Sequence, residues 1–176
     1  MALTLLSDRD SQTLRSTGFS FEAVGEGFDA APPGFLRHQR SRILRRRDFE
    51  SAVHDLLSWR AHERAGLRVA ASDIPLREGT VVLMRLGVGP LSLRIPCRVT
   101  TLINEPQRRG FSYATLVGHP EEGEERFVLE HLNDGRIRFT ITAISRPASR
   151  LARISGPIGR RFQLFMTERY LKALLP

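Results

Sequence analysis

The chain of 176 residues is 41% hydrophobic and 26% charged, a composition typical of soluble globular domains and sufficient for one sizeable core. No stretch approaches the ~20 apolar residues that span a bilayer, and the single Cys97 excludes an intrachain disulfide framework and a multi-cysteine zinc site. The start, MALTLLSDRD, has neither the basic segment nor the apolar run of a signal peptide, so we expect a cytoplasmic protein.

The net charge of +8 comes from 27 basic and 19 acidic residues, and Lys172 is the only lysine. Such an excess permits binding to nucleic acid or to an anionic membrane surface without requiring either. The basic run from Arg37 to Arg47 lacks interleaved aromatic residues, which disfavours a single-stranded nucleic acid as partner. A basic nucleic-acid or anionic-lipid binding module is therefore the least favoured of the functions that the sequence suggests.

The N-terminal residues 1–34 are polar and weakly patterned, and we expect them to form an arm that packs on the body. Pro32-Pro33-Gly34 then turns the chain. Residues 35–176 are predicted to form one domain.

That domain begins with a strand over residues 35–44 and a helix for which Asp48 is a good N-cap. Trp59 is expected to end the helix. The apolar residues of the helix repeat at one face: Phe49, Val53, Leu56 and Leu57.

From Gly66 onward the apolar residues alternate with the period of strands. The predicted strands cover residues 67–71, 80–86, 91–103, 111–117, 127–131 and 137–143. After a break near Pro157 the chain becomes helical again, with Met166 on its apolar face. Consecutive hairpins favour an α+β fold in which a curved antiparallel sheet of six to seven strands wraps around the long C-terminal helix. Such a fold leaves a cavity between sheet and helix that suits an apolar ligand.

The stretch from Gly110 to Phe127 carries the residues best suited to chemistry. A predicted strand through Tyr113 ends at Gly118-His119-Pro120, because proline cannot donate to a ladder. Four carboxylates follow within five residues: Glu121, Glu122, Glu124 and Glu125. In one interpretation, Glu121 and Glu122 form a solvated turn, and Glu124 and Glu125 alternate in a new strand that becomes apolar at Phe127.

The same residues also suit proton transfer, since an imidazole beside a carboxylate titrates near neutral pH. An enzyme of the cyclase or hydratase type would use His119 and one of Glu124 and Glu125 as acid and base, with Tyr113 orienting the substrate. In the structural alternative, whichever of the two glutamates points inward pairs with Arg98, Arg126 or Arg146.

Several stretches together resemble the family catalogued as domain of unknown function 1990, also called uncharacterised protein family 0548. They are Phe21 to Gly25, Pro33 to Phe35, Trp59, Pro96 to Val99, Gly110 to Leu116, Gly118 to Glu121, Gly123 to Phe127, Ser145 to Pro147, and Tyr170-Leu171. The family is similar to the helix-grip superfamily of START-like lipid-transfer and polyketide-cyclase-like proteins. The resemblance implies that fold and implies no reaction.

We therefore predict a protein that holds a small, largely apolar molecule between its sheet and its C-terminal helix. The residues expected to bind the ligand are Trp59, Tyr113, Thr115, His119, Arg146, Phe162 and Met166. No cofactor is expected, and no metal, because His119 with Glu121 and His54 or His62 lacks a metal-ligand spacing such as HExxH.

Overall fold

The computed structural model describes residues 3–89, 92–148 and 156–175, and within the last range the side chains from Arg161 onward except that of Phe162. The elements in chain order are β1 Thr4–Leu5, α1 Asp8–Ser16, β2 Leu36–Ile43, α2 Phe49–Leu57, α3 Arg60–Arg64, β3 Arg68–Ala71, β4 Val81–Leu86, β5 Leu93–Glu105, β6 Arg108–Thr115, β7 Glu121–His131, β8 Ile137–Pro147 and α5 Gly156–Ala173.

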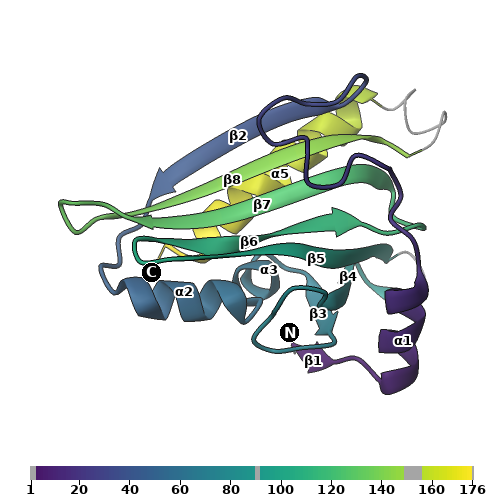
Figure 1. The fold of residues 1–176 in the computed structure, drawn as a ribbon, viewed down its shortest axis with the longest axis horizontal. Helices are drawn as coiled ribbons and strands as arrows, with labels where there is room; N and C mark the ends of the chain where they lie inside the picture. Colours follow the sequence, from purple (N-terminus) through teal and green to yellow (C-terminus); the bar gives the residue numbers. More distant parts are fainter. Residues whose placement is uncertain (1–2, 90–91, 149–155, 176) are drawn as a thin grey trace.

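Within these ranges eight strands form one sheet, in the order β1-β3-β4-β5-β6-β7-β8-β2 (Figure 1). The α+β class and the C-terminal helix are confirmed. The predicted six to seven strands are too few, because β1 has only two residues and shows no alternation. The sheet is also mostly rather than wholly antiparallel, since β1 pairs parallel with β3.

The two faces of the sheet differ in what covers them. We call the face that carries Phe127 and packs against α5 the inner face, and the face that carries Glu124 the outer face. On the inner face, Gln163 of α5 donates a hydrogen bond to Ser145 of β8 over 2.6 Å. The loop from residue 17 to residue 35 crosses the outer face, and Figure 1 shows this loop in front of the strands and α5 behind them.

Helices α2 and α3 complete the inner core. α2 begins as predicted, because the Asp48 carboxylate accepts a hydrogen bond from the Ser51 amide over 3.0 Å. It ends at Leu57, and Trp59 links it to α3, a helix that the sequence does not predict. Trp59 has a φ of 62°, rare outside glycine, and its side chain is fully buried. Packing of the indole in the core therefore holds the chain in this turn.

Strand β5 changes faces midway along its length. The sequence predicts that Val99, Thr101 and Ile103 share one side, but the register shifts between Val99 and Thr101. Beyond the shift Leu102 packs on the inner core opposite Phe111, and Thr101 is exposed. One extra residue reverses every later side chain, and alternation does not reveal it where apolar residues occur at both parities.

Helix α1 covers part of the outer face. Its Leu14 packs with Val81 and Leu116. The Arg98 guanidinium donates to the carbonyl oxygens of Leu14, Arg15 and Thr17 at 3.0, 2.8 and 2.6 Å. A cation at a helix C-terminus is electrostatically favourable, so Arg98 ties α1 to β5.

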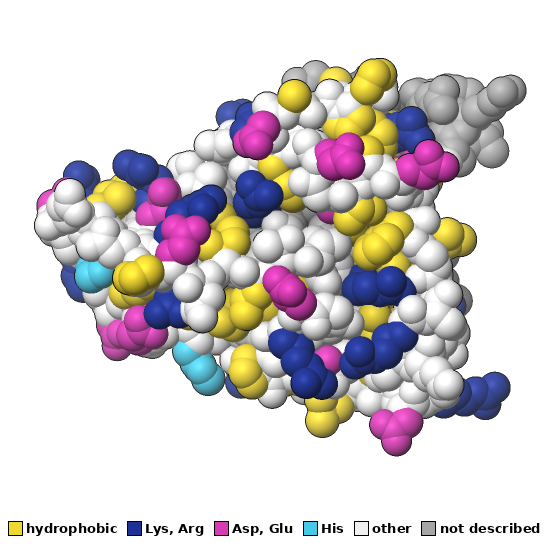
Figure 2. Space-filling model, viewed as in Figure 1, with side chains coloured by type: hydrophobic (Ala, Val, Ile, Leu, Met, Phe, Trp, Pro, Cys, Tyr) yellow, Lys and Arg dark blue, Asp and Glu magenta, His cyan; other side chains and the backbone are white. Residues whose placement is uncertain are grey.

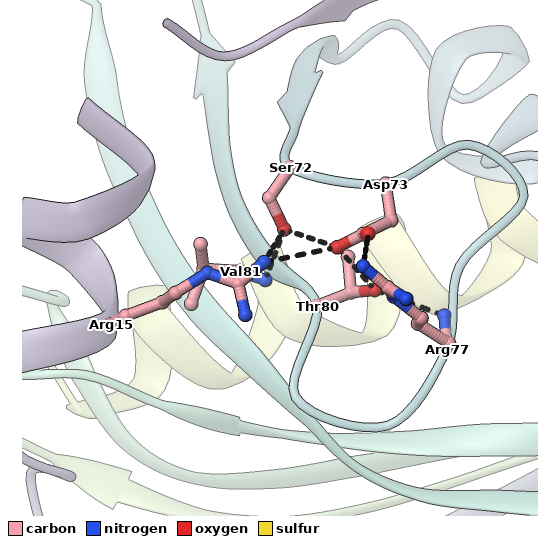
Figure 3. Close-up of polar contacts among 6 residues, drawn as sticks. All are labelled: Arg15, Ser72, Asp73, Arg77, Thr80 and Val81. Atoms are coloured by element: carbon pink, nitrogen blue, oxygen red, sulfur yellow. Dashed lines mark hydrogen bonds and ion pairs between the residues drawn. The ribbon is translucent and has the colours of Figure 1, made fainter. Parts of the chain in front are cut away.

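The loop after β3 ties α1 down a second time, through Asp73 (Figure 3). Asp73 accepts from Ser72 at 2.6 Å and Thr80 at 3.2 Å, and pairs with Arg77 at 2.6 Å and with Arg15 of α1 at 3.3 Å. Burial alone would raise the pKa of Asp73, but the hydrogen bonds from Ser72, Arg77 and Thr80 hold it below its usual value.

Candidate functional site

The acidic cluster lies within strand β7 and is divided between the two faces of the sheet. The interpretation of Glu121 and Glu122 as a turn is wrong, because β7 begins at Glu121 and pairs with β8 as far as Pro147. The expected alternation of Glu124 and Glu125 is present, with Glu125 on the inner face and Glu124 on the outer face.

Glu125 and Tyr113 form the polar centre of the inner face. The Tyr113 hydroxyl donates to Glu125 Oε2 over 2.6 Å, so the partner of the inner glutamate is a phenol and not an arginine. Burial raises the pKa of Glu125 to about 7; the hydrogen bond from Tyr113 opposes this shift and the nearby Glu121 carboxylate adds to it. As a whole residue, Glu125 is half-buried. The site thus combines a carboxyl group that titrates near neutral pH with apolar surroundings.

Aromatic rings surround this pair on the inner face. Trp59 and Tyr113 stack with ring centroids 6.4 Å apart, and Phe127 meets Tyr170 edge-on at 5.5 Å. Burial raises the pKa of the Tyr170 hydroxyl well above its usual value, and so does the charge of Glu125. The wall of the site is therefore apolar, with hydroxyl groups held in their neutral form.

His62 lies inside this aromatic cluster and is absent from the set of residues predicted to bind ligand. It is 0% exposed, with Phe127 and Tyr170 ring centroids each 4.9 Å away. Neither ring nitrogen has a hydrogen-bond partner among the described residues, and neither does Nε1 of Trp59. Burial lowers the pKa of His62 to about 3, so the ring is neutral. The only sequence signal is its spacing of three residues from Trp59, one helical turn.

His119 does not join this pair. Its Nδ1 lies 2.7 Å from the Glu121 carbonyl oxygen and 2.9 Å from the Glu121 amide nitrogen, so its hydrogen bonding is with the backbone of a neighbouring residue. Burial lowers the pKa of His119 to about 4. Within the described ranges no hydrogen bond connects His119 with Glu124 or Glu125.

Glu124 is held by the loop that crosses the outer face. Its Oε1 accepts a hydrogen bond from the Gly25 amide over 2.8 Å, while Oε2 is buried without a partner among the described residues. Burial raises its pKa to about 7, and the Gly25 hydrogen bond and the Arg126 charge oppose this shift. The two glutamates proposed as alternatives for one role therefore occupy separate environments.

Three of the residues predicted to bind ligand lie in the inner core, and a fourth is not described. Trp59, Tyr113 and Met166 belong to the inner core. The side chain of Phe162 lies outside the described residues.

Thr115 and Arg146 make structural contacts. Thr115 Oγ1 accepts from the Gly123 amide over 2.9 Å where β6 and β7 separate. Arg146 pairs with Glu122 at 2.7 Å and lies over the Phe35 ring at 4.6 Å, on the outer side. Among the described residues, neither forms a hydrogen bond with Glu125 or Tyr113.

The described residues offer neither a metal cluster nor a membrane-spanning helix. No group of three or more histidine, cysteine, aspartate or glutamate side chains there could hold a metal ion. None of the helices in that part of the chain is long and apolar enough to cross a membrane.

The order of strands and the C-terminal helix on one face define a helix-grip-like fold, and solved structures share it. A hypothetical protein, jhp0584, from Helicobacter pylori aligns with a TM-score of 0.56 at 14% identity, covering 80% of this chain and 85% of its own. A protein from Arthrobacter aurescens gives 0.56 at 15% identity, with 79% and 86% covered. Ara h 8.0201 gives 0.52 at 10% identity, with 80% and 99% covered. At such identities the likeness concerns the fold alone.

The chain belongs to the family described as Domain of unknown function (DUF1990), whose model matches residues 20–173. Two relatives are each named UPF0548 protein. The one from Deinococcus radiodurans is 34% identical over 113 residues, 60% of this chain and 57% of that protein. The one from Dictyostelium discoideum is 30% identical over 128 residues, 65% of this chain and 59% of that protein. The matched region thus spans less than two thirds of either relative.

Proposed function

We propose that this protein binds a small, largely apolar molecule at the inner face, with one hydrogen-bond donor of the ligand directed at Glu125. The observation that carries the proposal is a half-buried glutamate on an aromatic surface, with Tyr113 as the side chain that donates a hydrogen bond to its carboxylate at 2.6 Å. A buried or half-buried carboxylate with too few hydrogen-bond donors is energetically unfavourable. A donor group on the ligand would supply the missing hydrogen bond.

The unpartnered nitrogens of His62 and Trp59 support the same conclusion. Buried polar groups are nearly always hydrogen-bonded, and exceptions concentrate where a ligand, ion or water completes the shell. The helix-grip-like fold is compatible with a site between sheet and helix, a common location for apolar ligands with few polar contacts.

The test uses the single tryptophan as a reporter, because Trp59 lies in the inner core. N-phenyl-1-naphthylamine is uncharged, apolar and carries one N–H, and it absorbs where tryptophan emits. We expect saturable energy transfer from Trp59 to the bound probe. At pH 8, where Glu125 is ionised, Glu125→Gln should weaken binding by about 3- to 10-fold, because a neutral amide oxygen replaces the charged acceptor and the hydrogen bond becomes weaker.

Glu124→Gln is the matched control, since it makes the same change at the adjacent residue on the other face. It should leave the affinity within about twofold. The proposal fails if the probe shows no transfer from Trp59, or if both variants weaken binding equally. Native mass spectrometry of the freshly purified protein would additionally show whether a molecule of a few hundred daltons accompanies it.

Acid–base catalysis at the same place is a second candidate, favoured by the Glu125 pKa of about 7. It would use Glu125 and Tyr113, because Glu124 faces outward and the His119 Nδ1 contacts the backbone of Glu121. Side-chain carbon NMR, assigned with Glu125→Gln, would measure this pKa. A value near the ordinary 4.5 would exclude proton transfer by Glu125 at neutral pH.

A further inference from the structure

The outer face carries a groove that the inner site does not involve. Its volume is about 450 Å³, within the range of small-molecule sites, and its floor is formed by strands β6, β7, β8 and β2. It lies beside the loop of residues 17–35, which supplies Phe28 and Asp29 to the rim. In Figure 2 basic and acidic side chains are mixed on this face of the molecule.

Charge distinguishes the groove from the inner site. Arg37, Arg108, Arg126 and Arg138 line it, against the carboxylates of Asp29 and Glu130. The lining side chains therefore carry two positive charges in excess, one of which, on Arg108, is paired at 3.3 Å with Glu105 outside the lining. Such concentrations of one sign raise the local concentration of oppositely charged ligands.

Arg108 and Arg126 lie close together, and among the described residues no single carboxylate forms an ion pair with both. Burial lowers the pKa of Arg126 and the nearby charge of Arg108 lowers it further, while the charges of Asp29 and Glu124 raise it. The Arg126 guanidinium lies 3.8 Å from the centre of the Phe28 ring, and its Nε contacts Ser112 Oγ at 3.3 Å. Its terminal nitrogens have no hydrogen-bond partner among the described residues. The ring thus holds the guanidinium in place with the N–H groups of its terminal nitrogens available to an anion.

On the opposite wall, hydrogen bonds hold Gln39 and Arg37 in place and leave hydrogen-bond donors available. Gln39 Oε1 accepts from Arg37 at 2.8 Å and from Thr142 at 3.3 Å. Because both partners donate to the oxygen, the amide nitrogen of Gln39, a residue that lines the groove, remains an unused donor. Arg37 is itself held by a 2.8 Å hydrogen bond from Nε to the Phe28 carbonyl oxygen. The groove therefore has preorganised donors on two sides.

We propose that this outer groove binds a small soluble phosphomonoester. A phosphomonoester carries close to two negative charges at neutral pH and offers three acceptor oxygens, matching the charge excess and the planar guanidinium donors. The hydroxyls of Ser41 and Thr140 on the floor are 2.9 Å apart and add further hydrogen-bonding groups to the groove. The limited volume favours a compact ligand over a polymer that would extend beyond it.

Isothermal titration with phenyl phosphate, and with phenol as the uncharged analogue, tests the proposal at 50 and 200 mM salt. Phenyl phosphate should bind and phenol should not. Arg126→Gln should weaken binding by about 10- to 100-fold, the effect of losing charge-assisted hydrogen bonds. Arg94→Gln is the matched control, because it removes the same charge from an exposed position of β5 outside the groove, and it should change the affinity less than twofold.

Arg138→Gln provides a second variant if Arg126→Gln does not fold, since the Arg138 side chain is 45% exposed and its 3.6 Å pair with Glu130 is weak. Each variant should keep its binding of N-phenyl-1-naphthylamine, which separates this groove from the inner site. Absence of phenyl phosphate binding, or equal weakening by Arg94→Gln, overturns the proposal. Tighter binding of a single-stranded oligonucleotide or of anionic phosphatidylserine vesicles than of phenyl phosphate, lost in Arg126→Gln, would also overturn it in favour of a macromolecular or membrane partner.

Discussion

The inner and outer faces of one sheet have different surroundings, and strand β7 shows this residue by residue. Phe127 is fully buried among aromatic rings of the inner core, whereas its neighbour Val128 lies on the floor of a groove lined by arginines. Glu125 and Glu124 differ in the same way, the first bonded to a phenol and the second to the backbone of a crossing loop. Strand alternation thus allows one segment to border an apolar region and a charged region at once.

The test with the largest expected effect shortens one side chain on each face of β7 and compares the losses in stability. Phe127→Ala should lower the free energy of unfolding by about 3–5 kcal/mol, because it leaves a cavity in the inner core. Val128→Ala should lower it by about 1 kcal/mol, since Val128 borders a groove rather than the core. Urea unfolding followed by circular dichroism measures both values. Equal losses would show that the outer face contributes as much packing as the inner one.

A second test uses the pH dependence of stability. Both Glu124 and Glu125 have a pKa raised from 4.5 to about 7, so the folded state holds protons that the unfolded state has released. Stability must therefore fall as pH rises from about 4.5 to 7, by roughly 3 kcal/mol for each group. Each Glu→Gln change should remove its own part of that slope.

Thermal unfolding across about pH 4.5–8 compares the two variants directly, with the double variant as a check on additivity. His62, whose pKa is lowered from 6.5 to about 3, contributes the opposite slope below pH 6.5 in every variant and cancels from the differences. A slope unchanged in Glu125→Gln would show that this carboxyl group is not held in a desolvated environment.

The smallest expected effect concerns the attachment of α1 to the outer face. Asp73→Asn should lower the free energy of unfolding by about 1–2 kcal/mol at neutral pH, because it weakens the hydrogen bonds and ion pairs with Ser72, Arg77 and Arg15. The pKa of Asp73 is lowered, so this contribution is present above pH 3.8 and lost as pH falls below it. Unfolding at pH 7 and at pH 3 measures the difference. Asp134→Asn, at an exposed hairpin, should have no comparable effect.

Local signals in the sequence are enough to predict much of this fold. Asp48 caps α2 as its residue type predicts, and the alternating stretches correspond to β3 through β8. These features depend on residues close in the chain, where propensity and periodicity act directly. Strand β1 and helix α3 are not predicted because both are too short to show a period.

The site is harder to predict because it depends on register. Alternation shows that Glu124 and Glu125 face opposite ways, but which of them meets Tyr113 follows from the pairing of β7 with β6, where Tyr113 lies opposite Glu125. His62 belongs to the site only because α3 places it against strands far along the chain. The outer groove brings together Arg37, Arg126 and Arg138 from three strands, and the sequence shows them only as separate charges.

Strand β2 ends the sheet with eight residues whose second edge pairs with no other described strand. An unprotected edge of this length is a template on which another chain can add a strand. Three of its eight residues are arginines, so a second copy arriving there would bring like charges into register before any ladder could form. The three arginines of β2 would thus disfavour edge-to-edge joining of two copies, a consequence unrelated to binding.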